Sequence, residues 1–223
     1  MKKIVVLHGW GQNSASWHPF MNTFSEGEVE CFDLPGFGSE PRPTDAWGVP
    51  EYAAWVRARI ESSGWTDVVL LGHSFGGRIA ACLAADRPAW LSRLVLYGAP
   101  CVYRPLHSVR LRNALARFLR PIRRVVSSGL RTPDLRDAEA AGLGDVFRRV
   151  VGFDQTERLA RIAVPTLLVW GSDDAEVPLA VAEETCVRIP GSELKVIERA
   201  GHNAHLDAPY YFYGIVRTFA QDR

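Results

Sequence analysis

The chain has 223 residues, of which 47% are hydrophobic and 23% are charged. That length and apolar content suit one globular domain with a full core, so two independent domains are not expected. The 26 Lys and Arg residues are balanced by 25 Asp and Glu residues, which leaves a formal net charge of +1. The overall charge therefore gives no support to a nucleic-acid-binding protein.

The apolar segments and the cysteines indicate a protein of the reducing cytoplasm. Only residues 4–7 form an apolar run after Met1-Lys2-Lys3, which is shorter than the core of a signal peptide. No segment approaches the roughly 18 to 20 apolar residues of a membrane helix, so we expect no membrane contact. The four cysteines share no metal-ligand or redox spacing, so we expect buried thiols and no structural metal at Cys31, Cys82, Cys101 and Cys186.

Short β-branched runs alternate with longer helical patterns along the chain. Each run ends near Gly, Pro or Asp, as parallel strands do when both of their faces are covered. The pattern predicts an α/β fold with a mostly parallel sheet of about six strands, flanked by helices and joined by right-handed crossovers. The expected strands are 4–7, 29–34, 68–71, 94–97, 166–170 and 194–197, and the expected helices are 15–24, 51–62, 75–85, 179–187 and 210–220.

The connection between the fourth and fifth expected strands is far longer than the roughly 10 to 12 residues that a crossover requires. Apolar residues at helical spacing occur within it at 111–122 and 146–151, with breaks at Pro121 and 142–144. We predict a helical cap insertion over residues 101–153, on a core made of residues 1–100 and 154–223. Residues 101–150 hold 11 Arg and no Lys against 4 Asp and Glu, a net charge of +7.

Residues 72–77 read Gly-His-Ser-Phe-Gly-Gly and lie between an expected strand and an expected helix. In this setting G-x-S-x-G is the pattern of a nucleophile elbow, which exposes a serine hydroxyl on a very tight turn. Side chains two residues before and after Ser74 would collide there, so the turn needs glycine at Gly72 and Gly76. We therefore predict that Ser74 is a catalytic nucleophile, rather than part of a plain glycine-rich turn.

A serine hydroxyl needs a base to remove its proton and an acid that holds the base in the right tautomer. Two later loops offer such groups, reading GSDDAEVP at 171–178 and RAGHNAH at 199–205. Both leave the carboxyl end of an expected strand, where parallel sheets place their sites. Asp173 and Asp174 are candidates for the acid, and His202 and His205 are candidates for the base. We expect Glu176 at the loop surface.

With these motifs the chain resembles the α/β-hydrolase superfamily along essentially its whole length. In that family the acid commonly ends G-x-x-D and the base follows the glycine of G-H, so the resemblance selects Asp174 and His202. The family's H-G-x-G turn, here residues 8–11, implies that the backbone N–H of Trp10 joins that of Phe75 in an oxyanion hole. The other histidines near these motifs, His8 and His73, are expected to brace the first turn and to pack beside the elbow.

A serine with a base and oxyanion donors indicates hydrolysis of a carboxylic ester through an acyl-enzyme, with no metal or organic cofactor. Serine in place of aspartate at the elbow disfavours haloalkane dehalogenase and epoxide hydrolase chemistry. Thioesterase, lactonase, carbon–carbon bond hydrolase and perhydrolase activities use the same triad and stay open. The non-enzymatic alternative is a small-molecule receptor built on a hydrolase scaffold that has lost its activity. Such a receptor is expected to lack a member of the triad, and no such loss is seen in the sequence.

Two loops resemble, more narrowly, those of the pimeloyl carrier-protein methyl ester esterases of biotin synthesis. These loops are residues 8–11, which read HGWG, and residues 33–39, which read DLPGFGS. In that group basic cap residues bind an acidic carrier protein that bears the acyl chain, and the net charge of +7 here suits that task. The alternative is that these arginines only solvate exposed helix faces and pair with the acidic core.

Overall fold

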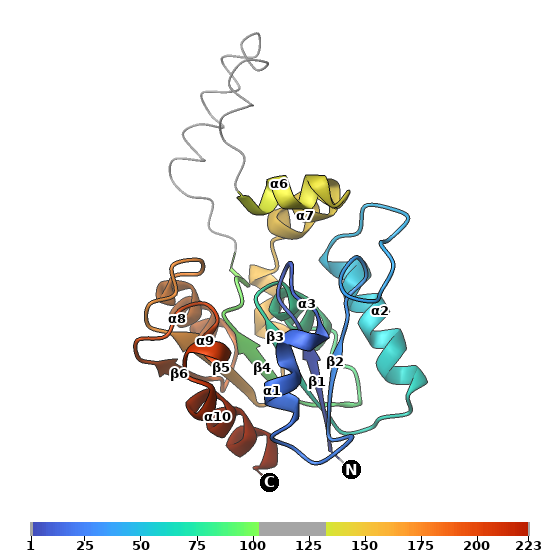
Figure 1. Ribbon diagram of the computed structural model, residues 1–223. Helices are drawn as coiled ribbons and strands as arrows, with labels where there is room; N and C mark the ends of the chain where they lie inside the picture. The colour runs from blue at the N-terminus through green and yellow to red at the C-terminus, as the bar shows by residue number, and fades with distance from the viewer. Residues whose placement is uncertain (1, 103–132, 223) are drawn as a thin grey trace.

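The computed structural model describes residues 2–102 and 133–222, which form a parallel sheet flanked by helices (Figure 1). Within these residues six strands lie in the order β2-β1-β3-β4-β5-β6, and every neighbouring pair is parallel. The predicted α/β fold with a six-stranded sheet is thus confirmed. The strands are β1 Lys3–Leu7, β2 Val29–Phe32, β3 Val68–His73, β4 Leu91–Tyr97, β5 Thr166–Gly171 and β6 Glu193–Ile197.

The main helices follow the expected pattern, with one correction near the N-terminus. The helix predicted over 15–24 is a 3₁₀ turn, Ser14–Trp17, followed by a single α-helical turn. Pro19 in that first turn has no N–H to donate, so it starts a new helix instead of continuing one. The α-helices are α1 His18–Met21, α2 Val49–Ser62, α3 Phe75–Ala84, α6 Pro133–Ala140, α7 Gly144–Gly152, α8 Leu179–Arg188, α9 Ala204–Asp207 and α10 Pro209–Gln221.

Alternate residues of each strand pack into two separate cores, one on each face of the sheet. In β1, Val5 and Leu7 pack in the core that includes residues of α2, α3 and α8. Ile4 and Val6 point the other way, into the core formed with α1 and α10. Because both faces are covered, β1, β3 and β5 are buried along nearly their whole length, and this is what made them recognisable in the sequence.

Helices α6 and α7 belong to the predicted cap and lie beyond the end of the sheet that faces upward in Figure 1. The ring of Phe147 on α7 packs edge-on against Trp10, with centroids 5.0 Å apart, so α7 contacts the turn that follows β1. The expected helical segment at 111–122 lies outside the described residues. The division into a core (1–100 and 154–223) and a cap (101–153) stays a prediction.

The cysteines are free thiols, as their spacing indicated. Cys31, Cys82 and Cys101 are buried, and burial raises the pKa of each, which keeps the thiols protonated and poorly nucleophilic. Cys186 is partly exposed. In the described part of the chain, none of the helices has the length and apolar character needed to cross a membrane.

Candidate active site

Ser74 lies at the junction of β3 and α3 in a backbone conformation that is rare for residues other than glycine. Its φ is +50° and its ψ is −109°, and its N–H donates to the carbonyl of Tyr97 at 2.8 Å. A Cβ on Gly72 would lie 2.5 Å from the carbonyl oxygen of Gly76, and a Cβ on Gly76 would lie 2.1 Å from that of Leu7. Glycine is therefore required at both positions, although the obstacle at Gly76 is the neighbouring strand rather than the turn itself.

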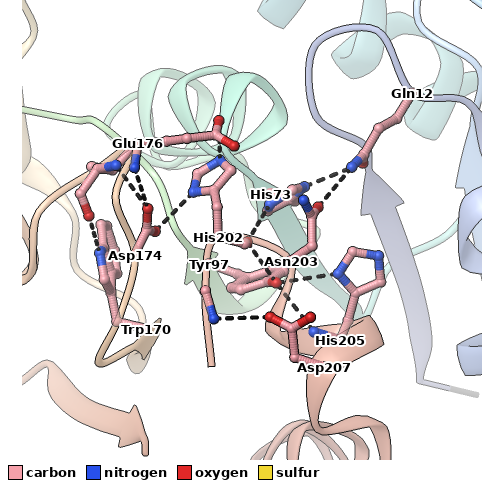
Figure 2. Close-up of polar contacts among 12 residues, drawn as sticks. Gln12, His73, Tyr97, Trp170, Asp174, Glu176, His202, Asn203, His205 and Asp207 are labelled. Carbon is pink, nitrogen blue, oxygen red and sulfur yellow. Dashed lines mark hydrogen bonds and ion pairs between the residues drawn. The ribbon is translucent and has the colours of Figure 1, made fainter. Parts of the chain in front are cut away.

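Of the two candidate acids, Asp174 faces His202, as Figure 2 shows. Its Oδ2 lies 2.8 Å from Nδ1 of His202, and the Asp174 side chain is only 1% exposed. The other oxygen, Oδ1, accepts the backbone N–H groups of Glu176 and Val177 at 2.9 and 2.8 Å. Asp173 is exposed, and its carboxylate accepts a hydrogen bond from the preceding serine. Both oxygens of the Asp174 carboxylate are thus hydrogen-bonded, one to His202 and the other to the backbone.

The backbone of His202 is held by buried donors from neighbouring strands (Figure 2). The hydroxyl of Tyr97, at the end of β4, donates to the carbonyl of His202 at 2.8 Å. His73, at the end of β3, donates to the same carbonyl from Nε2 at 3.1 Å. The side-chain amide of Gln12 donates to Asn203 at 3.0 Å, which ties the turn after β1 to the same loop. Groups far apart in sequence therefore fix the loop that carries the imidazole.

His205, the other candidate base, lies in the core. Its ring stacks on Trp17 with centroids 4.5 Å apart and planes inclined by 2°, and the residue is 1% exposed. Its backbone N–H donates to the Tyr97 hydroxyl at 3.2 Å. Burial lowers the pKa of His205 to about 4. His205 does not line the cavity that contains Ser74, whereas His202 does.

Ser74 and His202 line one cavity of about 690 Å³. Within the described residues the Ser74 hydroxyl has no hydrogen bond to Nε2 of His202, and this nitrogen faces the Glu176 carboxylate, with Oε2 at 3.6 Å. Hydrogen bonds between a nucleophile and its base are often long in ligand-free proteins and shorten in the complex with substrate. The apolar lining side chains are Trp10, Phe75, Pro100, Phe147, Val150, Val151 and Val177, and the charged ones are Arg78, Asp134 and Glu176.

The two residues predicted to supply oxyanion donors lie side by side at the cavity wall. The rings of Trp10 and Phe75 meet edge-on with centroids 5.2 Å apart. Phe75 is the first residue of α3, so its N–H has no acceptor within the helix. Within the described residues, neither this N–H nor that of Trp10 donates a hydrogen bond. His8 braces this turn as expected, since Nδ1 donates to the Gly9 carbonyl and Nε2 accepts the Leu34 N–H.

Arg78 and Glu176, two charged residues that line the cavity, were not among the residues assigned to the site from the sequence. Arg78 is 8% exposed and donates to the Phe153 carbonyl at 3.3 Å. Its position four residues after Ser74 puts it on the same side of α3, a signal that could have identified it. Glu176 is exposed, as expected for the loop surface, and its carboxylate also lies near His202. Among the described residues, no group of three or more His, Cys, Asp or Glu side chains could hold a metal ion.

Burial lowers the pKa values of His8, His73 and His205. These rings stay neutral in the folded protein and take up protons on unfolding below about pH 6.5, so stability present at neutral pH is lost as the pH falls. We predict that the free energy of unfolding drops between pH 7 and pH 5, with a contribution of about 2 kcal/mol from His205, whose pKa is about 4. Urea unfolding at several pH values measures this.

The matched variants are His205→Phe, which keeps a ring on Trp17, and His18→Gln, which changes an exposed imidazole. The drop between pH 7 and pH 5 should be about 2 kcal/mol smaller in His205→Phe than in wild type and in His18→Gln. Equal drops in all three proteins would contradict the prediction.

The chain is similar to known proteins over nearly its whole length. Residues 4–213 match the Alpha/beta hydrolase family. A pimeloyl-[acyl-carrier protein] methyl ester esterase from Aeromonas salmonicida is 29% identical, over 97% of this chain and 94% of that protein. A 2-hydroxy-6-oxononadienedioate/2-hydroxy-6-oxononatrienedioate hydrolase from Cupriavidus pinatubonensis is 26% identical, over 97% and 86%. The solved esterase from Exiguobacterium antarcticum has a TM-score of 0.78 and 24% identity, over 100% of this chain and 92% of that one. The chain belongs to the alpha/beta hydrolase family.

Proposed function

We propose that this protein is a serine hydrolase that cleaves carboxylic esters through an acyl-enzyme. In this proposal Ser74 is the nucleophile, His202 is the general base and acid, and Asp174 orients His202. The backbone N–H groups of Trp10 and Phe75 bind the oxyanion. The observation that carries the proposal is the 2.8 Å contact between Asp174 and His202 beside a cavity that Ser74 also lines.

The mechanism follows from the different surroundings of the two ring nitrogens of His202. Nδ1–H of His202 donates to Asp174, which leaves the lone pair on Nε2 to take the proton from the Ser74 hydroxyl. Ser74 Oγ bonds to the acyl carbon, and the carbonyl oxygen becomes an oxyanion that the two N–H groups stabilise. The bond to the alcohol oxygen then breaks as Nε2–H gives its proton to the leaving alkoxide. Water repeats the sequence on the acyl-enzyme and releases the acid.

Ser74→Ala tests this proposal most directly. We expect the kcat for a short acyl p-nitrophenyl ester to fall at least about a thousandfold, because no other described group at this site supplies an activated nucleophile. A thioester, a lactone and a carbon–carbon bond substrate, measured alongside, decide which linkage is cleaved best. Most of the activity surviving in Ser74→Ala would mean that another group attacks, and no hydrolysis by wild type would favour a receptor.

Asp174→Asn and Asp173→Asn form a matched pair of conservative changes. In Asp174→Asn the amide oxygen would still accept the two backbone N–H groups, so the amide NH₂ would face Nδ1 of His202. That arrangement favours the tautomer with the proton on Nε2, which cannot accept the proton of Ser74. We expect kcat to fall about a thousandfold or more in Asp174→Asn and to stay within about twofold in Asp173→Asn. A larger fall in kcat in Asp173→Asn than in Asp174→Asn would make Asp173 the acid.

We further propose that the natural substrate is an ester of an acyl chain borne on an acidic carrier protein. Relatives named as pimeloyl-[acyl-carrier protein] methyl ester esterases support this, as does the net charge of +7 in residues 101–150. A cationic surface accelerates the encounter with an acidic partner and strengthens the complex at low salt. Most of that basic segment lies outside the described residues, so the support here comes from charge and relatedness.

Charge reversal at Arg123 and Arg124, two adjacent arginines of that segment, tests carrier recognition. We expect the double change to glutamate to raise KM for a carrier-borne methyl ester by roughly three- to tenfold at low salt, with little change for a p-nitrophenyl ester. Equal changes for both substrates, or no change for either, would argue against a carrier docking on these arginines.

A further inference from the structure

The Glu176 carboxylate lies beside the one ring nitrogen of His202 that faces the cavity. Its Oε2 is 3.6 Å from Nε2, and its side chain is 65% exposed (Figure 2). The loop beneath it is held in place, because the N–H groups of Glu176 and Val177 donate to Asp174 and the Trp170 indole donates to the Val177 carbonyl at 2.8 Å. The backbone that carries the Glu176 side chain is therefore fixed beside the imidazole.

Nε2 is also the atom that hands a proton to the departing alcohol in the proposed mechanism. The alcohol oxygen must approach within hydrogen-bond distance of Nε2 at that step. A group attached to that oxygen then lies within several ångströms of the Glu176 carboxylate. In the described residues, the other charged side chains lining the cavity are Arg78 and Asp134.

We propose that Glu176 is a specificity-determining residue that selects esters by the charge of their alcohol portion. A cationic alcohol group is attracted, a neutral one is accepted and an anionic one is repelled. The inference rests on the proposed ester hydrolysis at Ser74 and deepens it, because it assigns a chemical class to the alcohol side of the substrate. A methyl ester, with its small neutral alcohol, falls within that class.

The size of the effect follows from the exposure of Glu176. Two charges about 5 Å apart in a largely aqueous setting interact weakly, and dissolved salt screens them further. We therefore expect each unit of alcohol charge to change kcat/KM by roughly three- to tenfold at low ionic strength. This preference should shrink as salt is added, whereas a preference caused by shape would not.

Three butyrate esters of matched shape separate charge from size. Their alcohols carry, on the same two-carbon link, a trimethylammonium group, a neutral tert-butyl group or an anionic sulfonate. The variants are Glu176→Gln, Glu176→Lys and, as the matched control, Glu193→Gln, which removes a carboxylate on β6 that is 66% exposed and pairs with Lys195. The measurement is the ratio of kcat/KM for the cationic ester to that for the anionic ester, with the neutral ester as reference.

We expect wild type and Glu193→Gln to share one ratio, Glu176→Gln to lower it roughly tenfold or more, and Glu176→Lys to lower it further. High salt should bring the wild-type ratio toward that of Glu176→Gln. An unchanged ratio in both Glu176 variants would overturn the inference while Ser74-dependent hydrolysis still stood. If Ser74→Ala hydrolysed the neutral ester as well as wild type does, the proposed function would fall, and this inference would fall with it. Both would also fall if wild type hydrolysed none of the three esters.

Discussion

The site depends on how closely α3 approaches the sheet at Ser74. A Cβ at Gly72, Gly76 or Gly77 would lie 2.5 Å or less from Gly76, Leu7 or Ala99. Because none of these positions carries a side chain, the helix can begin directly on β3. That junction holds Ser74 at a φ of +50° and leaves the N–H of the next residue without a helical acceptor. A serine that lines the cavity and a backbone N–H without a helical acceptor are two consequences of the same close contact.

The parallel sheet brings the remaining groups to this junction from distant parts of the chain. The hydrogen bond from Tyr97 to His202 spans 105 residues, and that from Gln12 to Asn203 spans 191. His202 is held at its ring by Asp174 and at its carbonyl by Tyr97 and His73, so neither the ring nor its backbone can shift without breaking a buried bond. Groups held in this way have little freedom left to lose, as the proton transfer proposed for His202 requires.

The sequence predicted those parts that follow from local chemistry. Strands buried on both faces appear as apolar runs, and the elbow appears as glycines at a fixed spacing around Ser74, so both were recognisable. The orientation of Asp173 and Asp174 was not, because adjacent side chains diverge according to backbone angles that only the folded loop defines; the family pattern selected Asp174. Glu176 is at the loop surface as expected, but its contact with His202 also depends on the folded loop and could not be predicted.

The loop after β5 carries two acidic side chains, Asp174 and Glu176, that lie beside different ring nitrogens of His202. Asp174 contacts His202 through one oxygen and uses the other to bind the backbone of Glu176 and Val177. The side chain of Glu176 takes no part in those bonds, so its charge can change while the Asp174 carboxylate keeps every partner. The Asp174 carboxylate, itself held by backbone N–H groups, therefore orients the imidazole, whereas the Glu176 side chain places a negative charge near Nε2. A change of the Glu176 side chain would therefore alter the charge beside Nε2 and leave the bonds of the Asp174–His202 pair unchanged.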